Sequence, residues 1–286
     1  MSIEIKELKY TYSPGSPFAH KALDGINLSI PEGQVTAIIG QTGSGKSTLV
    51  QHLNGLLKVQ EGSIDIAGYH LEPQMKLKEI KQLRKKVGLV FQFPEYQLFE
   101  ETIGKDIAFG PINFGDTPEM AMEKAKTILP KVGLDESLIE RSPFDLSGGQ
   151  KRRVAIAGIL VQDPEILVLD EPAAGLDPQG TEEMMNLFMS LNKEQGKTII
   201  LVSHDMEHVL QYCDNVIVLE NGKVKTFCDT KTFFKHPEWM KEIGINPPGI
   251  VTLKQKLMEN GFVIDPEIFD EEELAVAIES QVKSNG

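Results

Sequence analysis

A glycine-rich loop between a buried strand and a helix constrains this chain more than any other feature. Residues 40–47 read GQTGSGKS; they follow the apolar run 35–39, and residues 46–57 have helical spacing. Strand, glycine loop and helix in that order form a phosphate-binding turn of an α/β sheet. The pattern should arise by chance in about one chain in a hundred of this length. The sequence therefore predicts an α/β fold around a phosphate site.

The loop supplies three kinds of group to a nucleotide. Its backbone N–H groups can surround a phosphate because the glycines permit unusual dihedral angles and leave the approach open. Lys46 brings a positive charge to the β and γ phosphates, aided by the positive end of the helix, and Ser47 offers a hydroxyl to Mg²⁺. A glycine-rich surface turn is the alternative. The residues expected to hold ATP here are Gly40, Thr42, Gly43, Ser44, Gly45, Lys46, Ser47 and Thr48.

Two acidic residues end a second buried strand, where residues 166–171 read ILVLDE. Ligands of a doubly wound sheet bind at the carboxyl ends of its strands. We expect Asp170 to hold the Mg²⁺ shell and Glu171 to take the proton from the attacking water, or to orient that water. An acidic pair in this place is often only a helix cap. The glycine loop upstream and Asp177 downstream favour the catalytic interpretation.

Three more residues lie where they can reach the nucleotide. Gln92 and His204 each end an apolar strand; the amide can touch metal or water, and the imidazole can bond a γ-phosphate. A lone histidine is more often structural, which is how we interpret the other five. Tyr12 can stack on adenine. Ordinary packing of Tyr12 or its neighbour Tyr10 is the alternative, since both point to one face of a strand.

A second glycine motif, LSGGQ, occupies residues 146–150. Ser147, Gly148 and Gly149, with Gln150, begin a predicted helix, where a hydroxyl, bare backbone N–H groups and the helix dipole form another anion receptor. One chain thus carries two phosphate receptors. The residues alone leave open whether the two face different molecules.

The rest of the chain surrounds these motifs with a mixed sheet and two helical additions. The Asn221-Gly222 pair predicts a hairpin, and a helical subdomain is expected at about 93–160. Strands are predicted at 3–10, 23–30, 35–39, 63–67, 87–92, 165–169, 198–202, 216–219 and 223–227. Helices are predicted at 46–57, 119–132, 146–160, 178–194, 251–259 and 271–282.

Composition limits the class of protein. A length of 286 residues allows one large domain with a small appendage, and the net charge of −13 disfavours a nucleic-acid binder. The start lacks a basic region followed by an apolar core, and no apolar run reaches membrane-spanning length, so we expect a cytosolic chain that can sit on a membrane protein. Cys213 and Cys228 are expected to be reduced and to have packing roles.

Over residues 3–227 the motifs resemble the ATPases of ABC transporters. The resemblance implies a P-loop NTPase fold, with a mixed, mainly parallel central sheet, an antiparallel β subdomain and an inserted helical signature subdomain. It also implies that LSGGQ of one subunit closes over ATP held by the phosphate loop of another. Carried over to this sequence, Tyr12 is the adenine-stacking position, Gln92 the Q-loop, Asp177 the D-loop and His204 the switch histidine.

A closer resemblance is to the energy-coupling factor (ECF) transporter ATPases, particularly the A-prime partner of a heterodimer. The segments that carry it read FQFPEYQLF (91–99), DIAFGPINFG (106–115) and ERSPFDLSGGQKRRVAIAG (140–158). It implies a sister ATPase, a transmembrane coupling subunit and a substrate-capturing membrane subunit, with this chain on the cytoplasmic face importing a vitamin or transition-metal ion. Residues 1–229 are then the ATPase domain, and 230–286 a helical C-terminal extension that contacts another subunit.

Two alternatives stay open. Soluble relatives with LSGGQ-like motifs act on nucleic acid or ribosomes, but they generally carry a long coiled-coil insertion or two cassettes, and this chain shows neither. The aromatic segment 91–99 either docks a helix of the membrane subunit or packs in the core.

Overall fold

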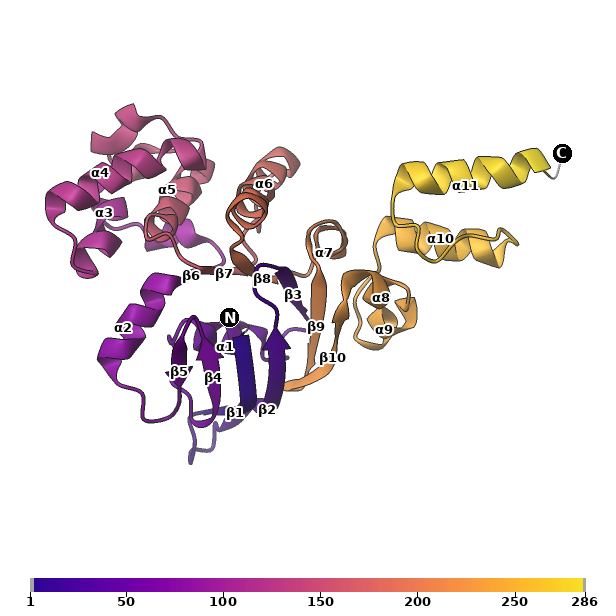
Figure 1. The fold of residues 1–286 in the computed structure, drawn as a ribbon, viewed down its shortest axis with the longest axis horizontal. Coiled ribbons are helices and arrows are strands. Elements are labelled where there is room, and N and C mark those ends of the chain that lie inside the picture. Colours follow the sequence, from indigo (N-terminus) through magenta and orange to yellow (C-terminus); the bar gives the residue numbers. More distant parts are fainter. Residues whose placement is uncertain (1–2, 285–286) are drawn as a thin grey trace.

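The computed structural model describes residues 3–284, in which a six-stranded sheet forms the centre of the molecule (Figure 1). The strand order is β10-β9-β3-β8-β7-β6; five neighbouring strands are parallel, and β10 is an antiparallel edge. The predicted mixed, mainly parallel sheet is confirmed. Its strands are β3 (Val35–Ile39), β6 (Val87–Val90), β7 (Ile166–Asp170), β8 (Thr198–Val202), β9 (Asn215–Glu220) and β10 (Lys223–Asp229).

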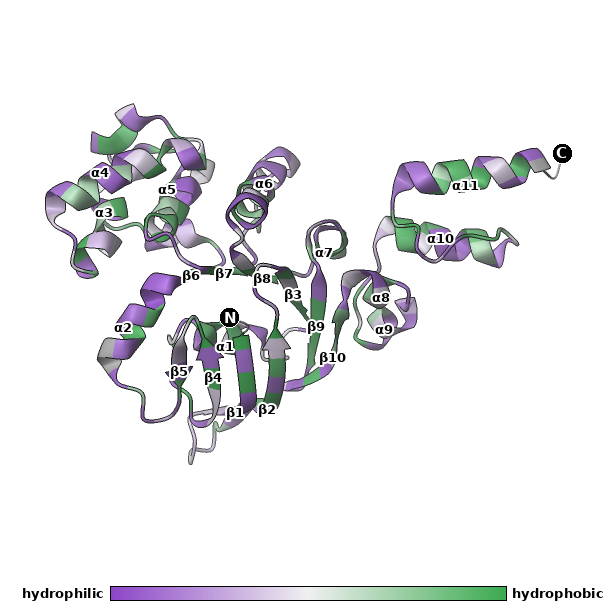
Figure 2. Ribbon diagram, in the orientation of Figure 1, coloured by the Kyte–Doolittle hydropathy of each residue, from purple (hydrophilic) through white to green (hydrophobic). Residues whose placement is uncertain are grey.

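A second, antiparallel sheet packs on one face of the first. Its order is β2-β1-β4-β5, and Figure 2 shows β1 and β2 banded with alternating hydrophobic and hydrophilic residues. That alternation is typical of a sheet with one buried face, whereas β3, β6 and β8 are buried throughout. The four strands are β1 (Ile3–Tyr12), β2 (His20–Ile30), β4 (Glu61–Ile66) and β5 (Tyr69–Leu71).

Helix α1 (Lys46–Leu53) lies between the two sheets and carries the phosphate loop at its start. Leu49, Val50 and Leu53 join the apolar core formed there. The predicted extension of this helix to residue 57 is wrong. The chain leaves the helix at Asn54, and Gly55 adopts φ 66°, a left-handed conformation that ends helices and that glycine adopts without steric cost.

Helices cover the opposite face of the central sheet. Helix α6 (Pro178–Gln195) buries Met185 and Phe188 in a second core with α5 (Gly148–Leu160), and the short helix α7 (Met206–Tyr212) follows β8. The inserted subdomain forms between β6 and β7, as predicted, from α3 (Ile103–Asn113), α4 (Pro118–Ile128), α5 and 3-10 turns that begin with η1 (Pro94–Gln97). Helix α2 (Leu77–Lys86) connects β5 to β6.

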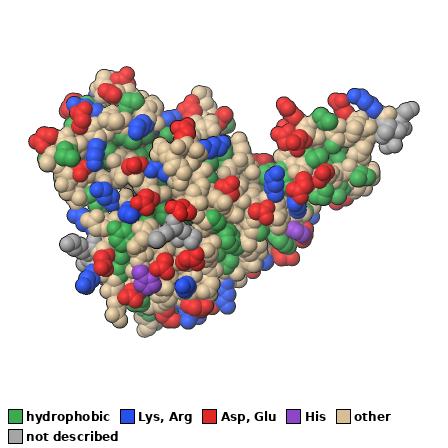
Figure 3. Space-filling model, viewed as in Figure 1, with side chains coloured by type: hydrophobic (Ala, Val, Ile, Leu, Met, Phe, Trp, Pro, Cys, Tyr) green, Lys and Arg blue, Asp and Glu red, His purple; other side chains and the backbone are tan. Residues whose placement is uncertain are grey.

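The C-terminal residues form an arm that projects from the body, with a hollow between the two (Figures 1 and 3). The buried Lys254 holds the arm together: its ammonium donates to the carbonyls of Pro266 and Ile268 and lies 4.2 Å from the ring centroid of Phe269. No helix within residues 3–284 is long and apolar enough to cross a membrane. The four helices are α8 (Thr230–Phe234), α9 (Pro237–Glu242), α10 (Gly249–Glu259) and α11 (Glu271–Ser284).

Candidate active site

The phosphate loop has a backbone that only glycine can follow at two points. Gly40 has φ 146°, and a Cβ added there would lie 2.2 Å from the carbonyl oxygen of Leu219. Gly45 has φ 105°, and a Cβ added there would lie 2.6 Å from the carbonyl oxygen of Ala22. Gly45 is the N-cap of α1 and offers no capping side chain. The helix start is therefore not covered by a cap and faces the loop, as an anion receptor requires.

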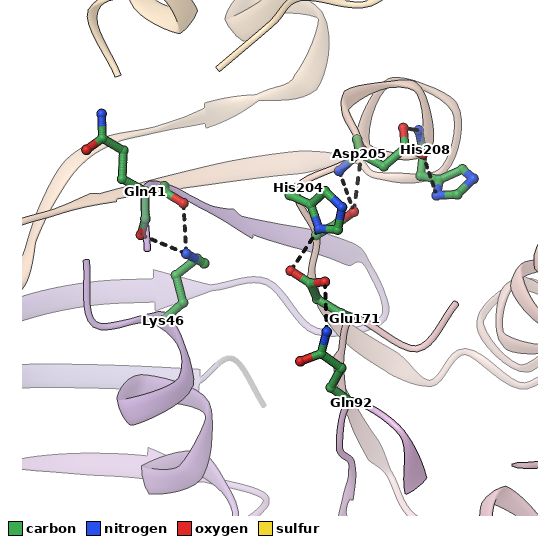
Figure 4. Close-up of polar contacts among 9 residues, drawn as sticks. Gln41, Lys46, Gln92, Glu171, His204, Asp205 and His208 are labelled. Carbon is green, nitrogen blue, oxygen red and sulfur yellow. Dashed lines mark hydrogen bonds and ion pairs between the residues drawn. The ribbon is translucent and has the colours of Figure 1, made fainter. Parts of the chain in front are cut away.

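Lys46 folds back over this loop. Its Nζ donates to the carbonyl oxygens of Gly40 at 2.8 Å and Gln41 at 2.9 Å (Figure 4). Burial lowers the pKa of Lys46, while the carboxylates of Glu171 and Asp170 act in the opposite direction. A partly desolvated ammonium at the mouth of the loop interacts more strongly with an anion than one in water does.

The acidic end of β7 places carboxylate oxygen atoms beside the phosphate loop. Burial raises the pKa of Asp170, and the charge of Glu171 raises it further, while a hydrogen bond from Ser47 and the charge of Lys46 lower it. A hydroxyl and a half-buried carboxylate with excess negative charge are suited to Mg²⁺, which takes few protein ligands and completes its shell with phosphate and water. No cluster of three or more His, Cys, Asp or Glu suited to a metal occurs within residues 3–284.

Glu171 lies between the side chains of His204 and Gln92, which separate sequence motifs predict. His204 Nδ1 lies 2.9 Å from Oε1, and Gln92 Nε2 donates to Oε2 at 3.5 Å, from the opposite side (Figure 4). Glu171 itself has φ 50°, and its N–H donates to the carbonyl of Val202 on β8. A positive φ on a residue other than glycine costs energy and is concentrated at functional sites.

The three residues line a cleft of about 650 Å³. Residues 172–176 and Pro178 form one wall, and Asp205 and His208 on the far side belong to the start of α7. Asp205 caps that helix by accepting the N–H groups of Glu207 and His208. His204, immediately before the cap, is 79% exposed and faces the cleft.

Tyr12 lies at the edge of the phosphate helix. Its hydroxyl is 3.2 Å from the hydroxyl of Thr48, and 38% of the residue is exposed. Tyr10 stands edge-on against Tyr12, with ring centroids 4.9 Å apart, and against buried His52 at 4.8 Å. Tyr10 thus has a packing role, and Tyr12 keeps accessible surface for a base.

The signature residues lie in a different part of the chain from the phosphate loop. Helix α5 packs with α3, α4 and η1, whereas α1 packs against β2 and β7. Ser147 caps α5 by accepting the N–H of Gln150, whose side chain accepts the N–H of Ser147 in return. Asp177 caps α6 in the same way, through the N–H of Gly180 at 2.7 Å.

The phosphate loop also makes a contact that no sequence pattern predicts. The amide of Gln41 donates to the carbonyl of Ile243 at 3.1 Å, and Glu207 on α7 accepts the N–H of Gly249 at 2.7 Å. The two anchors tie the C-cap of α9 and the first residue of α10 to elements of the nucleotide site. The only signal in the sequence is that Gln41, the second residue of the loop, is polar. That signal does not indicate which residue it bonds.

The fold and the site define a phosphate-loop ATPase, in which a glycine cradle, a lysine and an acidic strand end surround one nucleotide position. A model of the ABC transporter family matches residues 23–174. The energy-coupling factor transporter ATP-binding protein EcfA2 of Latilactobacillus sakei is 50% identical over 99% of this chain and 97% of its own, and that of Bacillus licheniformis is also 50% identical, with the same coverage of both chains.

Solved structures agree with this assignment. CbiO1 of Clostridium perfringens, part of the ABC transporter complex CbiONQ, has a TM-score of 0.72 and 40% identity over 88% of this chain and 98% of its own. A dimeric ABC cassette, MJ0796, bound to ADP and phosphate, has a TM-score of 0.71 and 31% identity over 80% and 98%. This chain belongs to the ABC transporter family, as an ATP-hydrolysing subunit of the energy-coupling factor type.

Proposed function

We propose that this chain binds ATP and Mg²⁺ at the loop 40–48 and hydrolyses ATP to drive import of a vitamin or transition-metal ion. The observation that carries the proposal is the position of Glu171, held by Gln92 and His204 at the end of β7. Glu171 takes the proton from the attacking water, Gln92 orients that water, and His204 bonds the γ-phosphate. Tyr12 stacks on the adenine.

Ser47, Asp170 and Gln92 hold the Mg²⁺, whose role is to neutralise charge on the β and γ phosphates. Lys46 provides a second positive charge at the same phosphates, and the N–H groups of the loop contact their oxygens. The excess negative charge around Asp170 supports this assignment, because a half-buried carboxylate with a raised pKa is stabilised when a cation arrives.

The site is completed by a second ATPase subunit across an interface that we call the seam. Ser147, Gly148, Gly149 and Gln150 of one subunit contact the γ-phosphate held by the other, and Asp177 lines the same seam. The separation of α5 from α1 within the fold supports this arrangement, as does the dimeric state of the MJ0796 cassette. A sister ATPase is the favoured partner, which makes the pair a heterodimer.

The subunit sits on the cytoplasmic face of the membrane, attached to a transmembrane coupling subunit that also binds a substrate-capturing membrane subunit. Residues 91–99, the docking segment, contact the coupling subunit. Their surface supports this, because Tyr96 is 85% exposed and Phe99 57% exposed, whereas a core role would bury both. The extension 230–286, beyond the ATPase domain 1–229, contacts another subunit through apolar residues that include Val263 and Val276.

Tyr96 provides the test of the docking segment. Tyr96→Ala removes an exposed ring without touching the cleft, so ATP binding by the purified chain should be unchanged while the membrane partner co-purifies less. The matched variant Phe18→Ala removes another ring that is 85% exposed, in the turn between β1 and β2, and should retain the partner. Equal recovery of the membrane partner by both variants would exclude the docking role.

Mass spectrometry of the intact assembly, extracted in mild detergent through a tag on this chain, tests the proposal as a whole. We expect one copy of this chain, one different ATPase and at least one integral membrane protein. Recovery of ribosomes or nucleic acid without a membrane protein would instead support a soluble ATPase switch. A pair of identical ATPase chains on a membrane partner would keep the transport function and refute the heterodimer.

A further inference from the structure

Arg152, in the second turn of the signature helix α5, is a buried charge that the proposed chemistry does not use. Only 3% of its side chain is exposed. A guanidinium cannot lose its proton in a protein, so burial requires full compensation by hydrogen bonds and an opposite charge. The partners that supply this compensation come from two other parts of the site.

The first partner is Glu95, in the 3-10 turn η1 of the docking segment. Nε donates to Oε2 at 3.0 Å and Nη2 donates to Oε1 at 2.9 Å, which is the bidentate geometry of the strongest arginine–carboxylate pairs. Burial alone would raise the pKa of Glu95, but the hydrogen bonds and charge of Arg152 lower it below its usual range. The pair is therefore ionised at neutral pH.

The second partner is the backbone immediately after Glu171. Nη1 of Arg152 donates to the carbonyl of Ala174 at 2.7 Å and to that of Pro172 at 3.4 Å. The guanidinium also lies 5.7 Å from the ring centroid of Phe93, next to Gln92. One side chain thus joins the helix that starts at the signature, the segment that follows Gln92 and the loop that follows Glu171.

We propose that Arg152 is a positioning residue that makes the signature helix, the docking segment and the loop 172–174 move as one unit when ATP closes the seam. The proposal rests on the function proposed above, since it needs both a seam and a docked membrane partner. Closure pulls on Ser147 at the start of α5, and Arg152 transmits this displacement to Glu95 at the docking surface. The same guanidinium fixes the position of Glu171 relative to the signature helix.

The arginine is required because its planar fork contacts three elements at once. Lysine in its place keeps the positive charge but has a single donor atom and cannot form the bidentate pair. Gln in place of Glu95 keeps the shape of the side chain and removes the charge. Arg152→Lys and Glu95→Gln therefore weaken the link while leaving the cleft residues in place.

Hydrogen–deuterium exchange of the detergent-extracted assembly, with and without ATP and Mg²⁺, distinguishes loss of the link between α5 and η1 from a general loss of stability. In the unmodified protein, ATP should slow exchange in both the first turn of α5 and η1. In Arg152→Lys and in Glu95→Gln we expect the α5 response to persist and the η1 response to fall at least threefold. In Arg152→Lys the KM for ATP should stay within about twofold while kcat falls roughly tenfold, because the loop 172–174 is released.

Lys197→Met is the control, because Lys197 is also buried and paired, with Asp163, but the hydrogen bonds described for it reach neither η1 nor the loop 172–174. It should lower stability and leave the η1 response intact. An η1 response of normal size in both Arg152→Lys and Glu95→Gln would overturn the linkage, as would an equal loss in Lys197→Met. Absence of any ATP response at α5 in the unmodified assembly would refute the seam itself, and with it this proposal.

Discussion

Glu171 shows how the site uses individual residues. The carboxylate is fixed from both sides, and its backbone is held in a left-handed conformation by the hydrogen bond to Val202 on the neighbouring strand. Such a conformation persists only where the surrounding structure enforces it. The parallel pairing of β7 with β8 supplies that enforcement, so the position of the proposed base depends on the sheet more than on its own loop.

Replacing Glu171 by Gln should stop turnover and preserve binding. The amide cannot accept a proton, so we expect kcat to fall by about 10² to 10⁴, while ATP and Mg²⁺ still bring two subunits together. Size-exclusion chromatography of the variant together with its sister ATPase and ATP should show a stable dimer. Lys46→Ala is the control, since it should lose ATP affinity and give no dimer. Rapid hydrolysis by Glu171→Gln in the full assembly would contradict the role of the base.

The two cysteines should react slowly in the native protein. Burial, with a smaller contribution from Asp229, raises the pKa of Cys228 to about 11, and burial raises that of Cys213 still further. At pH 8 the thiolate fraction of Cys228 is about a hundredfold or more below that of an exposed cysteine. Iodoacetamide labelling followed by mass spectrometry should be slower by that factor than in guanidinium chloride. Equal rates in both solvents would show that the thiols are not buried.

Sequence patterns predict site residues that belong to short local motifs and give no sign of residues whose partners lie elsewhere in the fold. The loop 40–48, Asp170 and Glu171 each follow from a short motif at the end of a strand. Gln41 and Arg152 have partners 202 and 57 positions away. No periodicity or spacing predicts such contacts, because they depend on how separate elements pack.

Among the elements, helix α3 shows why local propensity misled. Gly104, Gly110 and Pro111 argue against a helix in the sequence, yet residues 103–113 form one. A Cβ on Gly104 would lie 2.7 Å from the sulfur of Met122 on α4, so the glycine permits close contact between helices. Tertiary packing overrides propensity here, even though Pro111 lies inside the helix and has no N–H to donate to the carbonyl four residues earlier.

The anchor of the C-terminal arm on the phosphate loop is testable through Gln41. Gln41→Leu removes the hydrogen bond to the carbonyl of Ile243, and a hydrogen bond of this type contributes about 1 kcal/mol. Opening of the segment 243–249 should become about fivefold more frequent. Limited trypsin digestion should cut faster at the exposed Lys241.

The matched control for this prediction is Gln60→Leu. Gln60 also exchanges side-chain hydrogen bonds with backbone, at Thr11 on β1, but makes no contact with the arm among those described for it. It should leave cleavage at Lys241 unchanged. Identical digestion rates for the two variants and the unmodified chain would show that Gln41 does not secure the arm.

At the scale of the whole molecule, the separation of the two phosphate receptors predicts that hydrolysis depends on concentration. A group supplied in trans to a γ-phosphate can change the rate by about 10³ to 10⁵. Specific ATPase activity of the purified chain should therefore fall toward zero on dilution. Undiminished activity at nanomolar protein would mean that one chain forms a complete site.

Mixing two inactive variants identifies which chains meet at the seam. Lys46→Ala lacks a working phosphate loop, and Ser147→Arg lacks a working signature, so a mixed pair retains one intact site. Recovery of activity in the mixture would demonstrate self-pairing. If this chain pairs only with a different ATPase, the mixture should stay inactive and activity should return when the membrane assembly is reconstituted.

The projecting arm of α10 and α11 exposes apolar residues that can make the free subunit associate with itself. Val263, Val276 and Val282 are more than half exposed on a small element, and apolar surface of that kind promotes self-association when nothing covers it. In a cell that made this subunit in excess, the uncovered copies would be prone to self-association and to degradation. Balanced synthesis of this subunit and of the partner proposed to cover these valines should therefore limit self-association.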